Sequence, residues 1–198
     1  MFTKLEAVNQ MLEAIGESPV SSLDAGLVEA QKAIRVLERV TKEVLGKGWH
    51  YNTDRNITLV PDINQRIPIA EQVLLLDSTG KDKGVDVTLR FENGQRCLFN
   101  LDNRTFTFKN PVLVDIVWSR DFTELPHALQ LYVAALATRK FQESEMGSVA
   151  LDSFTRRQEL EAWTALMESE SEMVDVNILT DNPHCRFMTQ RHNPLFGS

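Results

Sequence analysis

Apolar residues recur at helical spacing in the first 45 residues, which predicts two amphipathic helices. Thr3 and Glu6 have the spacing of a capping box, in which each residue accepts a hydrogen bond at the start of a helix. Apolar positions then follow three or four residues apart until Gly16, a residue typical of a helix end. A second helix is predicted from an apolar face that consists of Leu27, Ala30, Ile34, Leu37, Thr41, Val44 and Leu45.

The spacing shortens to every second residue in the middle of the chain, which predicts a small, mostly antiparallel sheet. The candidate strands are residues 56–60, 72–76, 85–91, 96–101, 105–108 and 112–118. Residues typical of turns separate them. Asn93 and Gly94 predict a tight hairpin, because both residue types tolerate a positive φ.

Helical spacing returns near residue 123. Thr123 is the expected N-cap of a third helix, with Pro126 in the first turn, where a missing backbone N–H costs little. Gly147 and Ser148 are expected to end that helix before a fourth, longer and acidic one. No spacing recurs from residue 176 onward, which predicts an extended arm.

Together these patterns predict an α+β fold with a discontinuous helical domain. Residues 1–48 and 120–175 form an antiparallel bundle of about four helices, residues 49–119 form an inserted antiparallel β-subdomain, and residues 176–198 form an extended C-terminal arm. Trp49 and Tyr51 stand where helical spacing gives way to strand spacing. We expect both rings to be buried at the junction of the two parts.

Composition limits the environments in which the chain can work. With 198 residues and 42% hydrophobic content, the chain can bury a real core. Its apolar runs span only a few residues, so no membrane association is expected. The N-terminus leads directly into the first helix, and no secretory signal is expected there. Cys97 and Cys185 lie far apart in sequence, which favours free thiols in a reducing cytosol.

The net charge of −7 is concentrated in one segment. Residues 143–175 carry nine acidic side chains against Arg156 and Arg157, so the rest of the chain is close to neutral. The sequence shows no basic stripe that could hold phosphates, and tight binding to DNA or RNA is not expected.

Few residues in the sequence indicate a catalytic or metal-binding site. His184, Cys185 and His192 match no zinc spacing, and no metal or cofactor is expected. The pairs Asp115 with Asp121 and Glu143 with Glu145 could in principle hydrolyse a glycoside, but so acidic a chain supplies such pairs by chance. No phosphate-binding loop or nucleophile elbow occurs, so no catalytic residue is assigned.

Three blocks of the sequence carry a resemblance to a known family. They are residues 7–23 (AVNQMLEAIGESPVSSL), residues 48–52 (GWHYN) with 57–62 (ITLVPD), and residues 120–126 (RDFTELP) with 137–141 (ATRKF). In their order and spacing they resemble the tail tubular protein A family of short-tailed, podovirus-type bacteriophages. Residues 65–110 and the final arm carry no matching block.

The resemblance implies a structural protein of the virion tail that is assembled in the host cytoplasm. Members of that family act as gatekeepers or adaptors, forming a ring, expected to be a dodecamer, between the portal protein and the tail nozzle (tail tubular protein B), possibly with tail fibres nearby. Such a ring takes part in tail assembly and in DNA retention and ejection. The runner-up hypothesis is a phage-tail hydrolase of host surface polysaccharide, and a third is a host-side helical adaptor without a viral role.

Two sets of residues are expected to serve such a ring. Apolar residues of the arm are candidate contacts with a neighbouring subunit or the portal: Ile178, Leu179, Phe187, Leu195 and Phe196. The fourth helix could line the channel, where like charge keeps DNA from sticking, or it could equally face outward. Its candidate acidic face is Glu159, Glu161, Glu168 and Glu170.

Overall fold

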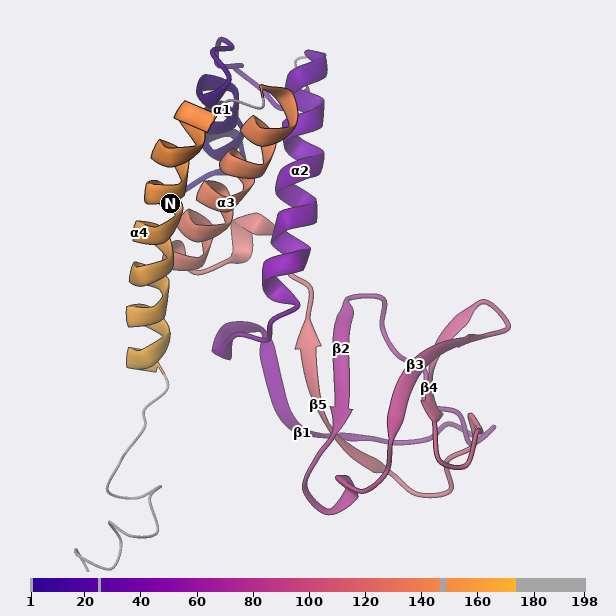
Figure 1. Cartoon of the computed structure of the whole chain (residues 1–198). Coiled ribbons are helices and arrows are strands. Elements are labelled where there is room, and N and C mark those ends of the chain that lie inside the picture. The colour runs from indigo at the N-terminus through magenta and orange to yellow at the C-terminus, as the bar shows by residue number, and fades with distance from the viewer. Residues whose placement is uncertain (1, 25, 147–148, 174–198) are drawn as a thin grey trace, which may run out of the picture.

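The computed structural model describes residues 2–24, 26–146 and 149–173 (Figure 1). The helices are α1 (Lys4–Ala14), α2 (Val28–Leu45), α3 (His127–Glu145) and α4 (Val149–Met173). The strands are β1 (Thr53–Leu59), β2 (Val73–Ser78), β3 (Val87–Glu92), β4 (Gln95–Asn100) and β5 (Val112–Trp118). The prediction of a mixed α+β fold is confirmed.

Helix α1 begins at the predicted capping box. The backbone N–H of Glu6 donates to Thr3 Oγ1 at 3.1 Å, and the backbone N–H of Thr3 donates to Glu6 Oε2 at 2.6 Å. These bonds satisfy N–H groups that have no partner inside the helix. Gly16 follows the helix with φ +81°, the left-handed conformation expected of a helix end.

The predicted N-cap of the third helix is wrong. Thr123 lies inside a 3₁₀ turn (Phe122–Glu124), and α3 begins only at His127. Leu125 is extended, with φ −68° and ψ 147°. The reason is Pro126, whose ring disfavours helical geometry in the preceding residue and so delays the helix.

Helix α3 is the central element of the helical part. It packs against α1, α2 and α4, and in Figure 1 α2 and α4 lie on opposite sides of α1 and α3. The core includes Val8 and Met11 of α1, Leu37 and Val44 of α2, and Phe141 of α3, all fully buried. Burial on several sides explains why α3 shows a weaker polar face than α2 in the sequence.

The strands form two antiparallel sheets. One has three strands in the order β1-β5-β2, and the other is the β3-β4 hairpin. Asn93 and Gly94 connect the hairpin with φ values of +50° and +80°, so the predicted tight turn is confirmed.

The strand predicted at residues 105–108 is wrong. Only an isolated bridge joins Thr105 to Asn100, and Arg104 before it turns with φ +51°. The backbone N–H of Thr107 donates to Thr105 Oγ1 at 3.0 Å, a local bond that competes with pairing to a neighbouring strand.

Buried side chains form two separate hydrophobic clusters. The helical cluster is described above, and the second lies between the two sheets. Its members are Ile67, Ile69, Val73, Val87, Leu98, Phe108, Val112, Val114 and Ile116. Two cores in one chain lead us to expect that the β-sheet part can open without the helices.

Cys97 provides a test of separate opening. The thiol lies in β4, 3% exposed, and burial raises its pKa, so it reacts with an alkylating reagent only when the sheets open. In a Cys185→Ser background Cys97 is the sole thiol. There, Leu98→Ala removes a fully buried side chain of the same cluster, which should cost about 2–5 kcal/mol and speed labelling roughly thirty-fold or more.

Leu37→Ala is the matched control, because it empties a similar volume in the helical cluster. We expect it to lower helical stability with much less effect on Cys97 labelling. Equal acceleration by the two substitutions would show that both clusters open as one unit.

Candidate functional site

Trp49 packs against the helices at the end of α2. The side chain is 7% exposed and belongs to the helical cluster. Its Nε1–H donates to the Val44 carbonyl at 2.7 Å, and its ring meets Trp163 of α4 edge to face with centroids 5.9 Å apart. The ring therefore joins α2 and α4 immediately before the chain enters the sheet.

Tyr51 is less buried than its sequence context predicts. It is 37% exposed, but its hydroxyl donates to the carbonyl of Glu124 at 2.7 Å. Glu124 stands where the chain returns from the sheet to the helices. Tyr51 thus connects the outgoing segment to the returning one through one hydrogen bond.

Asn52 is the residue of the junction that the sequence pattern misses. It is 1% exposed, and its Nδ2 donates to the carbonyls of Leu45 at 3.0 Å and Trp118 at 2.7 Å. Its Oδ1 accepts from the backbone N–H of Trp49 at 2.9 Å. One amide thus ties the end of α2 to the end of β5. Its polar neighbours in sequence give no sign that it is buried.

Gly48 allows the chain to turn sharply between α2 and β1. Its φ is +75°, and a Cβ there would lie 3.3 Å from Val117 Cγ2 and 3.4 Å from Thr53 Oγ1. The backbone passes this close to β5 because glycine has no side chain.

The acidic residues predicted to share one face of α4 lie on two faces. Glu159 is ion-paired with Arg139 of α3, which raises the pKa of the arginine, and Glu170 accepts from the backbone N–H of His50 at 3.1 Å. Both are half-buried, whereas Glu161 and Glu168 are exposed. Only Glu161 and Glu168 remain candidates for a solvent-facing acidic surface.

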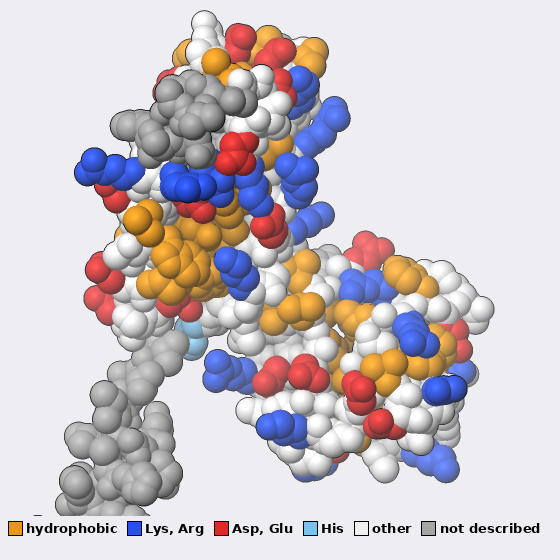
Figure 2. All heavy atoms as spheres, viewed as in Figure 1, with side chains coloured by type: hydrophobic (Ala, Val, Ile, Leu, Met, Phe, Trp, Pro, Cys, Tyr) orange, Lys and Arg blue, Asp and Glu red, His pale blue; other side chains and the backbone are white. Residues whose placement is uncertain are grey.

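An aromatic hollow lies between α3 and α4, visible in Figure 2 as an apolar area on the helical part. It has a volume of about 300 Å³, and its wall includes Leu160, 64% exposed. Lys47 Nζ stands 5.1 Å from the centroid of the Trp163 ring and 5.9 Å from that of Tyr132, whose pKa is raised by burial. This cation already covers the ring faces.

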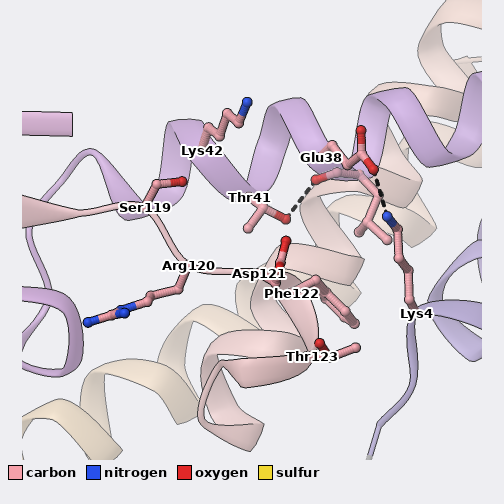
Figure 3. Close-up of a pocket in the computed structure, with 10 residues that line it drawn as sticks. Lys4, Glu38, Thr41, Lys42, Ser119, Arg120, Asp121, Phe122 and Thr123 are labelled. Atoms are coloured by element: carbon pink, nitrogen blue, oxygen red, sulfur yellow. Dashed lines mark hydrogen bonds and ion pairs between the residues drawn. The ribbon is translucent and has the colours of Figure 1, made fainter. Parts of the chain in front are cut away.

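A larger cleft of about 400 Å³ lies between α1, α2 and the segment after β5 (Figure 3). Lys4 Nζ is paired with Glu38 Oε1 at 2.6 Å, and Thr41 Oγ1 donates to the Leu37 carbonyl at 2.7 Å. Arg120 extends away from the other labelled side chains. Lys4, Glu38 and Thr41 therefore serve contacts within the protein.

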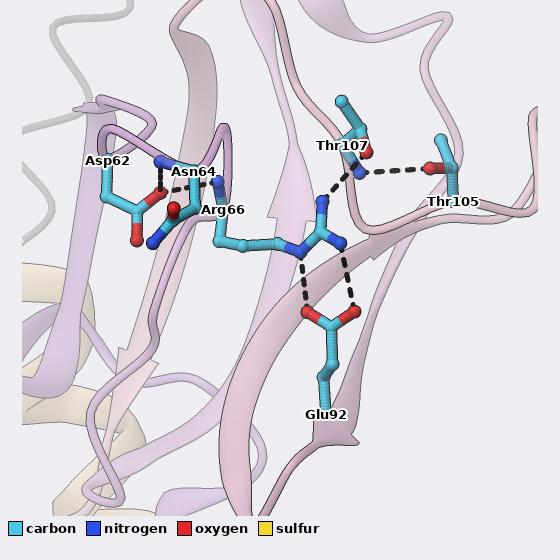
Figure 4. Close-up of polar contacts among 6 residues, drawn as sticks. All are labelled: Asp62, Asn64, Arg66, Glu92, Thr105 and Thr107. Atoms are coloured by element: carbon cyan, nitrogen blue, oxygen red, sulfur yellow. Dashed lines mark hydrogen bonds and ion pairs between the residues drawn. The ribbon is translucent and has the colours of Figure 1, made fainter.

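A polar cluster in the sheet part is also internally satisfied (Figure 4). Arg66 forms a two-pronged pair with Glu92, with Nε–Oε2 at 2.5 Å and Nη2–Oε1 at 3.1 Å, and donates through Nη1 to Thr107 Oγ1 at 2.8 Å. Asp62 Oδ1 accepts backbone N–H bonds from Asn64 and Arg66, each at 2.8 Å. The cluster fastens the loop after β1 to the hairpin.

Three of the four carboxylates considered for hydrolysis make structural contacts. Glu143 bonds Arg139, Glu145 Oε2 lies 2.9 Å from Lys32 Nζ, and Asp115 Oδ1 accepts from the Asn56 N–H at 2.8 Å. Within the described residues no group of three or more His, Cys, Asp or Glu could hold a metal ion. None of the helices described is long and apolar enough to span a membrane.

The predicted arm contacts Ile178, Leu179, Phe187, Leu195 and Phe196 lie outside the described residues, as do His184, Cys185 and His192.

Replacing Trp49 tests how much its side chain stabilises the junction. Trp49→Ala removes the contact with Trp163 and the bond to Val44, and should lower the free energy of unfolding by about 3–5 kcal/mol in urea titrations. Tyr51→Phe is the matched control, since it removes one hydrogen bond and keeps the ring, at a cost of about 0.5–1.5 kcal/mol. A smaller loss for Trp49→Ala than for Tyr51→Phe would contradict this assignment.

Comparison with known proteins agrees with the resemblance noted in the sequence. The family model of the tail tubular proteins matches residues 5–176. The chain is also 28% identical over 145 residues to tail tubular protein A of Klebsiella phage KP34, an alignment that covers 73% of this chain and 74% of that relative. The family match spans both clusters and the junction between them. The chain therefore belongs to the tail tubular protein family of bacteriophage tail proteins.

Proposed function

We propose that this protein is a non-enzymatic adaptor that forms a ring, a dodecamer in the virion, between the portal protein and the tail nozzle. The observation that carries the proposal is the family match over residues 5–176, which includes every described helix and strand but for the first residue of α1. The ring assembles on portal-containing heads in the host cytoplasm, retains the genome and lets it pass at ejection. The nozzle attaches below it, and tail fibres are a further proposed partner.

The clefts of the described residues support a structural role. The ion pairs Lys4–Glu38 and Arg66–Glu92 occupy the polar walls of two of them. A hydrolase needs two carboxyl groups left free to act on substrate, one of them as an acid. Each candidate pair has at least one member engaged in a structural contact, Asp115 in one pair and both Glu143 and Glu145 in the other, so no observation favours the hydrolase.

The C-terminal residues supply a contact with a neighbour in this proposal. Residues 177–198 contain apolar anchors without helical or strand spacing, and Leu195 and Phe196 follow Pro194 near the end. Burying these side chains on another surface lowers the free energy of such a segment. The adjacent subunit or the portal is the proposed surface.

Mixing the purified protein with its portal protein tests the ring. We expect a complex whose mass corresponds to a closed ring of copies on the portal, seen also as a ring by electron microscopy, and no release of sugar from host polysaccharide. A protein that never binds portal and degrades the polysaccharide at catalytic rates would overturn the proposal.

Deleting residues 177–198 tests the role of the C-terminal segment. The described helices and sheets should keep their stability, because the shortened chain retains both clusters. Attachment to portal-containing heads should fall at least about ten-fold if the segment adds 1.4 kcal/mol or more to binding. The double substitution Leu195→Ala/Phe196→Ala removes only the two apolar side chains that are proposed to dock. Normal attachment by both this variant and the deletion variant would refute the docking role.

A further inference from the structure

Helix α2 carries a stripe of basic side chains on its outer face. Lys32, Arg35, Arg39 and Lys42 are all exposed, and spacings of three and four residues place them on one side of the helix. Lys32 pairs with Glu145. Within the described residues, Arg35, Arg39 and Lys42 have no ion-pair partner. We call these four residues the basic stripe.

Two acidic residues of α2, Glu38 and Glu43, form ion pairs with cations outside this stripe. Glu38 pairs with Lys4 of α1 at 2.6 Å, and Glu43 pairs with Lys140 of α3 at 2.6 Å. These carboxylates are therefore engaged by cations of neighbouring helices. Glu38 and Glu43 nevertheless border the stripe on the same face, at spacings of three and four residues from Arg35, Arg39 and Lys42. The expectation that no basic stripe could hold phosphates is therefore not contradicted.

Helix α4 carries the opposite charge on its outer face. Glu161, Glu168 and Glu172 are exposed and lie on one side of the helix, with Ala165 between them. Arg157 pairs with Glu161 at 3.0 Å and reduces the charge only in part. We call these three glutamates the acidic stripe.

The two stripes belong to opposite flanks of the helical part. Figure 1 places α2 and α4 on either side of α1 and α3. Figure 2 shows Lys and Arg side chains gathered along the α2 edge, whereas the α4 edge carries acidic side chains below a group of basic ones. Arg35 to Lys42 extends about 10 Å along the helix axis and Glu161 to Glu172 about 16 Å. The basic groups can therefore lie alongside the acidic ones over about two turns.

We propose that the basic stripe of one copy binds the acidic stripe of the next copy in the ring. This inference rests on the proposed ring and names the contact that closes it. A ring needs a head-to-tail contact between two different surfaces of one subunit, and two flanks of opposite charge meet that requirement.

In the alternative arrangement, in which α4 lines the channel, more of these charges would be left without a partner of opposite sign. If Glu161 and Glu168 faced the channel, the opposite flank would point outward and the basic stripe would have no counter-charge. DNA is a weaker partner for the basic stripe, because three unpaired cations contact few phosphates and Glu38 and Glu43 border them. A second copy satisfies both flanks at once.

Reversing the charge on each flank tests the contact. Arg35→Glu/Arg39→Glu and Glu161→Lys/Glu168→Lys should each weaken ring formation on the portal at least about ten-fold, because like charges then face each other. An equimolar mixture of the two variants should restore the ring, since every contact between unlike copies is complementary again. The chain carrying all four substitutions should also form rings.

Lys81→Glu/Lys83→Glu is the matched control, because it makes the same change in charge in the exposed turn before β3. It should form rings normally, and Cys97 labelling should confirm that every variant is folded. Raising the salt concentration should weaken the wild-type ring more than that of an uncharged Arg35→Gln/Arg39→Gln/Glu161→Gln/Glu168→Gln variant.

The outcomes separate the inference from the proposed function. Normal rings from both reversed variants would overturn the inference and leave the ring in place, as would failure of the mixture to restore assembly. Normal rings with slowed genome ejection for Glu161→Lys/Glu168→Lys would assign α4 to the channel and overturn the contact. Loss of duplex DNA binding by Arg35→Glu/Arg39→Glu with normal rings would assign the basic stripe to DNA. Absence of any wild-type ring on the portal would overturn the proposed function itself.

Discussion

The side-chain amide of Asn52 holds together the two places where the chain passes between helices and sheet. It donates to the last residue of α2 and to the last residue of β5, and it accepts from Trp49. Because a buried amide left without partners costs free energy, the ends of α2 and β5 are held at a fixed separation. Gly48 lies close to β5 at the same crossing, where an added Cβ would come within 3.3 Å of Val117 Cγ2.

This junction sets how the two cores can serve an assembly. The helical core presents two long flanks, formed by α2 and α4, on a body centred on α3. The sheet core projects from one end of that body, and its position follows from the contacts at residues 48–52. In the clefts, Lys4 is paired with Glu38 and Arg66 with Glu92. Among the described residues, the outer faces of α2 and α4 carry exposed charges of opposite sign, a distribution that favours contacts between copies.

Local patterns in the sequence predicted much of the fold. The capping box of α1, the Asn93–Gly94 turn and the bounds of β5 were all predictable, because each depends on residues next to one another in sequence. Two local predictions were wrong, the N-cap at Thr123 and the strand at residues 105–108, where Pro126 and Thr105 change the backbone.

The features that matter for assembly were harder to predict. Asn52 bonds carbonyls that are 7 and 66 positions away, a relation that no local pattern contains. The acidic residues of α4 were predicted as a set, but Glu159 and Glu170 face the protein, because Arg139 and the backbone of His50 stand there. The basic stripe of α2 emerged only after the pairs made by Glu38 and Glu43 were known.

An electron-microscopy reconstruction of the protein bound to its portal tests the central claim most directly. The account predicts a closed ring in which the α2 flank of each copy lies against the α4 flank of the next, with the bonds of Asn52 intact in every copy. A ring in which α4 faces the channel, or one in which the sheet part has swung away from α2 and broken those bonds, would contradict it.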